Sequence, residues 1–125
     1  GAGGAGGRHP VTSCAMTPHD VVRLRLTRQH LTGAPLATAE DVVRHFAAVQ
    51  AQDYAGAKWS VAQRARDVSD RALDAALAGG ALLRTHVVRP TWHLVLPADL
   101  RWLLALTGPR VEAANAHMYR TLGID

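Results

Sequence analysis

Between residues 19 and 79 apolar side chains recur at intervals of three and four, a spacing that predicts amphipathic helices. A first helix is predicted over residues 19–31, because Thr17 can cap its first turn and Pro18 suits the first helical position. A second helix begins after Thr38, another good N-cap residue, and acidic residues in its first turn complement the helix dipole. Its apolar stripe consists of four residues at helical spacing, Val42, Val43, Phe46 and Val49.

Two further short helices follow. One is predicted over residues 58–66, with Trp59 buried, and one from Ser69 or Asp70 up to the glycine pair at 79–80. Helices of this length joined by short turns pack as a small bundle.

After the glycines the apolar period changes from helical spacing to alternation. Residues 81–88 and 91–96 are rich in strand-forming residues and predict two strands, with Trp92, Leu94 and Leu96 on one face of the second. The short connection between them makes a β-hairpin, although its proline excludes the common two-residue turns. A helix is expected from residue 97, a break at Gly108-Pro109, and a last helix over residues 109–122.

Helices followed by a hairpin predict a fold class that is mainly α with a short two-stranded β-hairpin, a winged helix-turn-helix. We expect three parts: a disordered glycine-rich leader at 1–17, a winged-helix domain at 18–107, and a helix at 108–125 leading towards a following domain.

Composition narrows the class of protein. The chain has 125 residues, of which 48% are hydrophobic, and no apolar run approaches the ~20 residues that a membrane span requires. Fourteen basic residues, all but one of them arginine, against ten acidic residues give a formal net charge of +4, which permits contact with nucleic acid. The single cysteine, Cys14, excludes an internal disulfide, and the seven histidines are too scattered for a zinc site. We therefore expect a cytoplasmic protein without metal or small-molecule cofactor.

Polar residues gather where the second helix should end. Gln50 and Gln52 would point about 200° apart on a continuing helix, so they can share a target only if the helix stops there. Gly56, which can adopt a positive φ, favours such an ending. On spacing alone, a polar helix end with surface amides is the simpler interpretation. Asp53 can act at such a site or cap the next helix.

Three stretches in the same order carry a family resemblance. They are RLRLTRQHLTG at 23–33, VVRHFAAVQAQDYAGAKWSVAQR at 42–64 and LLRTHVVRPTWHLVLPADLRWLLAL at 82–106. Over about residues 20–112 the chain resembles the N-terminal part of the bacterial winged-helix DNA glycosylases of the AlkZ/YcaQ type.

The resemblance implies hydrolysis of N-glycosidic bonds in double-stranded DNA, with excision of alkylated purines and unhooking of alkylated crosslinks. The family's catalytic motif, Gln-x-Gln or Gln-x-Asp, falls on Gln50 and Gln52. Family members are much longer and contain tandem winged-helix domains, so we expect this segment to be inactive alone. The only lysine, Lys58, has no visible feature that would lower its pKa, which favours a monofunctional, water-using enzyme over a lyase.

Basic residues on or near these elements are candidate DNA contacts, and each also has an ordinary structural interpretation. The candidates are Lys58, Arg84, Arg89 and His93. Arginines on alternate strand positions commonly face solvent, and His93 can equally serve a structural hydrogen bond. The alternative function is a non-catalytic winged-helix DNA-binding module resembling a transcription regulator. The oligomeric state stays open.

Overall fold

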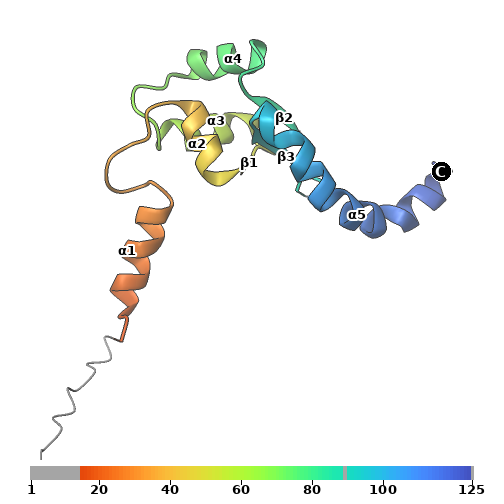
Figure 1. Cartoon of the computed structure of the whole chain (residues 1–125), viewed down its shortest axis with the longest axis horizontal. Helices are drawn as coiled ribbons and strands as arrows, with labels where there is room; N and C mark the ends of the chain where they lie inside the picture. Colours follow the sequence, from red (N-terminus) through yellow and green to blue (C-terminus); the bar gives the residue numbers. More distant parts are fainter. Residues whose placement is uncertain (1–14, 89, 125) are drawn as a thin grey trace, which may run out of the picture.

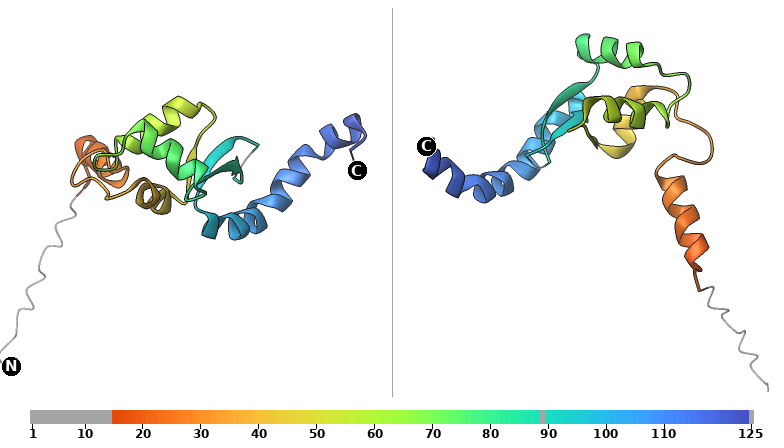
Figure 2. Two further views of the ribbon diagram at one scale, coloured as in Figure 1. Left: turned by 90° about the horizontal axis from the view of Figure 1, so that it is seen from above. Right: turned by 180° about the vertical axis from the view of Figure 1, so that it is seen from behind.

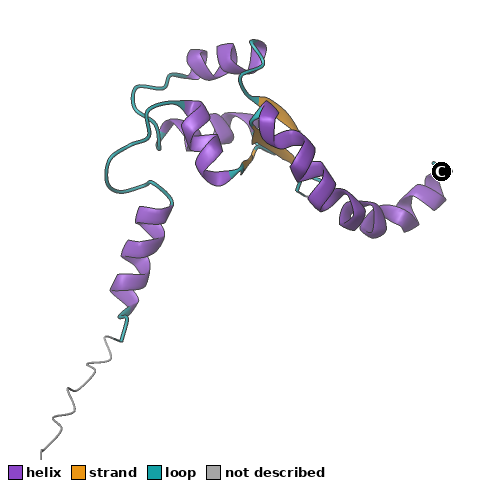
Figure 3. Ribbon diagram, viewed as in Figure 1, coloured by secondary structure: helices purple, strands orange, loops and turns teal. Residues whose placement is uncertain are grey.

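The computed structural model of the chain describes residues 15–88 and 90–124. In this range the chain forms mainly helices together with one small antiparallel sheet (Figure 1, Figure 3). The elements are α1 (Pro18–Arg28), α2 (Ala39–Phe46), β1 (Ala48–Gln50), α3 (Tyr54–Ala62), α4 (Asp70–Ala78), β2 (Leu83–His86), β3 (Trp92–Val95) and α5 (Pro97–Leu122). The predicted leader falls mostly on residues 1–14, which lie outside the described residues.

Side-chain caps fix three helix starts where the sequence predicts them. The hydroxyls of Thr17, Thr38 and Ser69 accept hydrogen bonds from backbone N–H groups in the first turns of α1, α2 and α4. Asp20 returns the bond to Thr17, which completes a capping box.

The sheet has three strands in the order β1-β3-β2, so the prediction of two strands was wrong in number. The antiparallel pairing of β2 with β3 forms the expected hairpin, in which Thr85 lies opposite His93. On its other edge β3 pairs with β1, where Gln50 lies opposite His93. The strand β1 has only three residues and was missed because its sequence continues the helical apolar pattern of α2.

The alternation predicted for the last strand is confirmed by the two apolar clusters of the domain. Leu94 and Leu96 are buried with residues of α2, α3 and α4, and Trp92 packs against the same cluster. Val95 points into a second cluster with Leu103 of α5. The sheet therefore separates a helical core from the first turns of α5.

Two helices extend away from this body. The views in Figures 1 and 2 agree that α1 and α5 leave the sheet and the three short helices in different directions. No residue of α1 is buried. The residues at its end are joined to the body by hydrogen bonds from His45 Nε2 to Arg28 O at 3.1 Å and from Arg64 Nε to Gln29 O at 2.8 Å.

The predicted break at Gly108-Pro109 was wrong, because α5 continues through both residues and contains Pro109 in its interior. Figure 2 shows the helix curving along its length. A proline removes one backbone hydrogen bond and bends a helix without necessarily ending it.

The limits of α2 and α3 also differ from the prediction. The second helix ends at Phe46, and Ala47 adopts a φ of 61° before the chain enters β1. The third helix begins at Tyr54 and ends at Ala62, earlier at both ends than predicted. Its Trp59 is 69% exposed, so the expectation of a buried tryptophan was wrong, and Trp102 in α5 is also exposed, at 46%.

Candidate active site

The Gln50-Ala51-Gln52 segment leaves the helical region and is held against the sheet. Gln50 ends β1, and the backbone N–H of Ala51 donates to Trp92 O at 2.7 Å. Gln50 ends β1 and Gln52 lies in the bend that follows, whereas on a continuing helix the two side chains would diverge. The early end of α2 therefore allows the two glutamines to act on one target.

Arg84 of β2 fixes the middle of this segment. Its Nε and Nη2 donate to Ala51 O at 3.1 and 3.0 Å, and Ala51 is fully buried. The guanidinium also lies over two aromatic rings, with its Cζ 4.6 Å from the centroid of Trp92 and 5.4 Å from that of Tyr54. The arginine predicted to contact DNA is thus half-buried and bound to the backbone between the two glutamines.

The amide of Gln52 is oriented by the backbone of β3. Its Oε1 accepts a hydrogen bond from Trp92 N at 3.2 Å. Because a backbone N–H can only donate, this contact identifies which end of the amide is the oxygen. The N–H₂ group is then the donor that Gln52 can offer to a bound group.

Both glutamines line one open hollow beside α3, with a volume of about 400 Å³. Its other lining residues are Asp53, Gly56, Ala57 and Ser60. Gly56 lies in the first part of α3 and is absent from the described glycines with positive φ, so its expected role in ending a helix was wrong. Ser60 was not singled out from the sequence, because only the position of α3 brings it to the glutamines.

Comparison with known proteins identifies the family. A family model described as "DNA glycosylase AlkZ-like" matches residues 43–125, which is most of the chain. The chain belongs to the AlkZ-like DNA glycosylase family. Among solved structures it is similar to the Streptomyces sahachiroi DNA glycosylase AlkZ, with a TM-score of 0.58 and 30% sequence identity. The match covers 74% of this chain and 27% of that one, so the AlkZ-like chain spans about a quarter of that glycosylase. No curated protein sequence matches it.

Lys58 of the AlkZ-like chain, predicted to contact DNA, is buried between α3 and α4. Its Nζ lies 2.6 Å from Asp70 Oδ1 and 3.0 Å from Asp74 Oδ1. Hydrogen bonds to Asp70 and Asp74 raise the pKa of Lys58 above its usual value, which keeps the ammonium protonated.

Tyr54 completes this network by donating from its hydroxyl to Asp74 Oδ1 at 2.6 Å. That hydrogen bond, followed by the one from Lys58, lowers the pKa of Asp74, and the same contact with Asp74 raises the pKa of Tyr54. The ring of Tyr54 lies under both Lys58 and Arg84, so it links the α3–α4 ion pairs to the arginine that binds Ala51.

His93, the third predicted DNA contact, is 4% exposed in the central strand. Its Nδ1 donates to Thr91 O at 2.8 Å, and its cross-strand neighbours are Gln50 and Thr85. The structure thus places His93 beside the first glutamine, beneath the surface. Arg89, the fourth predicted contact, lies outside the described residues.

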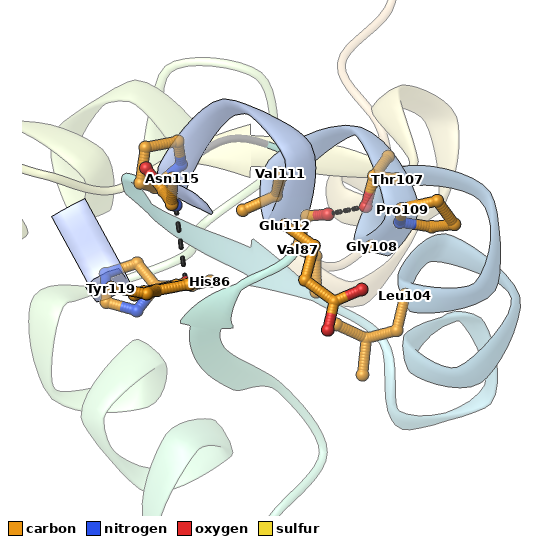
Figure 4. Close-up of a pocket in the computed structure, with 11 residues that line it drawn as sticks. His86, Val87, Leu104, Thr107, Gly108, Pro109, Val111, Glu112, Asn115 and Tyr119 are labelled. Carbon is orange, nitrogen blue, oxygen red and sulfur yellow. Dashed lines mark hydrogen bonds between the residues drawn. The ribbon is translucent and has the colours of Figure 1, made fainter. Parts of the chain in front are cut away.

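A larger hollow of about 500 Å³ lies elsewhere, between the end of the hairpin and the middle of α5 (Figure 4). In Figure 4, Thr107 contacts Val87 O, and Asn115 Nδ2 donates to Tyr119 Oη at 3.5 Å. None of its lining residues belongs to the glutamine segment, so its size does not make it the candidate active site.

Within the described ranges no helix is both long and apolar enough to cross a membrane. The same residues contain no group of three or more His, Cys, Asp or Glu side chains placed to hold a metal ion.

Proposed function

We propose that this chain is the catalytic N-terminal part of a monofunctional DNA glycosylase that removes alkylated purines from double-stranded DNA and unhooks alkylated crosslinks. The observation that carries the proposal is the convergence of Gln50 and Gln52 on one hollow in a chain of the AlkZ-like family. The restraint of Ala51 by Arg84 supports it, because a catalytic pair must be held in place before the substrate arrives.

The chemistry of the substrate explains how neutral amides can contribute to the reaction. A purine alkylated at N7 carries a positive charge, so the C1′–N9 bond can break with its electron pair moving onto the base. Water then forms a bond to C1′ and releases a proton, which leaves an abasic site and a neutral alkylated base. A glutamine oxygen can orient this water, and a glutamine N–H₂ can hold a sugar or phosphate oxygen.

A lyase reaction would require an unprotonated amine to attack C1′. Lys58 is the only lysine of the chain, and two carboxylates raise its pKa and bind its ammonium. We therefore assign hydrolysis by water without cleavage of the DNA strand.

The order of elements supports a winged-helix assignment. Helix α2, strand β1, helices α3 and α4 and the hairpin β2–β3 follow one another, and β1 pairs with β3. We infer from this order that α4 is the counterpart of a recognition helix and that the hairpin β2–β3 is the wing. Of the four predicted DNA contacts, Arg89 is the one we place against a phosphate, since Lys58, Arg84 and His93 have partners inside the domain.

The alternative, a non-catalytic module that reads DNA sequence, receives less support from α4. This helix carries Asp70 and Asp74 and only one basic residue, Arg71. A helix that enters the major groove normally presents basic and polar side chains to phosphates and bases. Binding without base release, at affinities that fall steeply with salt, would favour this alternative.

The test uses the protein expressed from its full reading frame and a duplex containing one N7-methylguanine. We expect free 7-methylguanine and an intact strand with an abasic site, and no release from the undamaged duplex. Strand cleavage that accompanies release would contradict the monofunctional mechanism. Absence of release across several N7- and N3-alkyl lesions, by a protein that binds the same duplexes, would contradict the proposed function.

A further inference from the structure

Asp53 stands at the N-cap of α3 but does not cap it. Its backbone O accepts from Ala57 N at 3.0 Å, whereas its side chain makes no capping hydrogen bond. The polar N-cap side chains of α1, α2 and α4 all make such bonds. An aspartate at this position ordinarily accepts from the first-turn N–H groups, so the carboxylate of Asp53 has a different place.

The carboxylate of Asp53 lies next to Gly56 instead. A Cβ added to Gly56 would lie 2.5 Å from Asp53 Oδ2, so the carboxylate would have to move away from its present position. Glycine weakens a helix relative to alanine, and Gly56 adopts no positive φ that would require it. The absence of a side chain on Gly56 therefore leaves room for the carboxylate of Asp53.

The carboxylate shares its hollow with the glutamine pair. Gln50, Gln52, Asp53 and Gly56 all line it, and Asp53 is exposed. An acceptor of protons thus lies beside two amides that can orient water but are themselves poor bases.

We propose that Asp53 is a third catalytic residue, which accepts the proton of the attacking water. This inference rests on the proposed glycosylase function and assigns the step that the two glutamines cannot perform. The water oxygen bonds to C1′, the electron pair of the C1′–N9 bond moves onto the cationic purine, and the proton passes to the carboxylate of Asp53. Gly56 acts through Asp53, as the residue that leaves space for it.

The test measures single-turnover release of 7-methylguanine by the full-length protein and three variants, Asp53→Asn, Gly56→Ala and the double substitution. Loss of a general base lowers such rates by about 10²- to 10⁴-fold, which we expect for Asp53→Asn with unchanged duplex affinity. Gly56→Ala should slow release while leaving the melting temperature equal or higher, because alanine favours the helix. In the Asp53→Asn background, Gly56→Ala should cause no further loss.

Asp67→Asn is the matched control, because Asp67 is also exposed and has no part in the hollow. Its positive φ of 53° suits asparagine, so we expect wild-type release. Asp53→Asn with wild-type release would overturn the inference while leaving the glycosylase intact. A further loss from Gly56→Ala in the Asp53→Asn background would show that the methyl group blocks the hollow, and would overturn the role given to Gly56. A wild-type protein without any release would overturn the proposed function itself and this inference with it.

Discussion

Replacing Arg84 with methionine keeps most of the side-chain volume and removes the guanidinium that donates to Ala51 O. Hydrogen bonds from a charged group contribute about 1.5–3 kcal/mol to stability, and two donors on one acceptor count for less than twice that value. Each cation–π contact adds about 0.5–1 kcal/mol. Because Ala51 is fully buried, its carbonyl would also lose the two donors without gaining water. We expect Arg84→Met to lower the free energy of unfolding by about 2–4 kcal/mol.

Urea unfolding monitored by circular dichroism measures this loss, provided that the free energy of unfolding falls with urea concentration at the same slope in each variant. Arg71→Met is the control, because Arg71 is exposed on α4 and should change stability by less than about 0.5 kcal/mol. Arg84→Lys should recover only a small part of the loss, since an ammonium cannot donate in two directions from a stacked plane. If Arg84→Met unfolds at the same urea concentration as Arg71→Met, the role given to Arg84 is refuted.

Two further predictions concern stability. Because the pKa of Asp74 is lowered, its carboxylate stabilises the fold above the ordinary carboxyl pKa of 3.8 and loses this effect as the pH falls towards the lowered pKa. Asp74→Asn should therefore lower the urea midpoint at pH 7, and its difference from wild type should narrow at pH 3; a constant difference would contradict the ion-pair account. Leu73→Ala should cost about 2–5 kcal/mol because Leu73 is fully buried, whereas Trp59→Ala should cost less than about 1 kcal/mol in the same assay. An equal cost at both sites would refute the exposure assigned to Trp59.

Local chemistry made part of the fold predictable. Thr17, Thr38 and Ser69 cap helices because a hydroxyl before an apolar-periodic stretch satisfies first-turn N–H groups wherever it occurs. The alternation of Leu94 and Val95 between two faces follows from strand geometry alone. Helix caps and strand alternation depend only on residues that are close together in the sequence, so they can be predicted from it.

Features that depend on distant residues were missed. Val49 fits the apolar stripe of α2, and only pairing with Leu94 converts it to strand. Lys58 is an unremarkable cation until Asp70 and Asp74 of the next helix surround it. Trp59 has a suitable spacing for a core residue, but α3 turns Ala57 and Val61 towards the core, which leaves Trp59 exposed.

The candidate site also has features that the sequence predicts and features that it does not. The family resemblance selected Gln50 and Gln52, and the spacing of two residues became meaningful once the chain between them proved to be non-helical. The contact of Arg84 with Ala51 depends on tertiary positions that no local pattern reports, whereas the space that Gly56 leaves for Asp53 is local and was missed because Gly56 was assigned to a helix end.

The most direct test of the central claim compares base release by the full-length wild type with that by the Gln50→Ala, Gln52→Ala double variant, on a duplex with one N7-methylguanine. Gln63→Ala serves as the matched control, because Gln63 is an exposed glutamine at the C-cap of α3. We expect the double variant to bind the duplex with unchanged affinity and to release base no faster than the spontaneous reaction, while Gln63→Ala behaves as wild type. Release by the double variant at the wild-type rate would contradict the account.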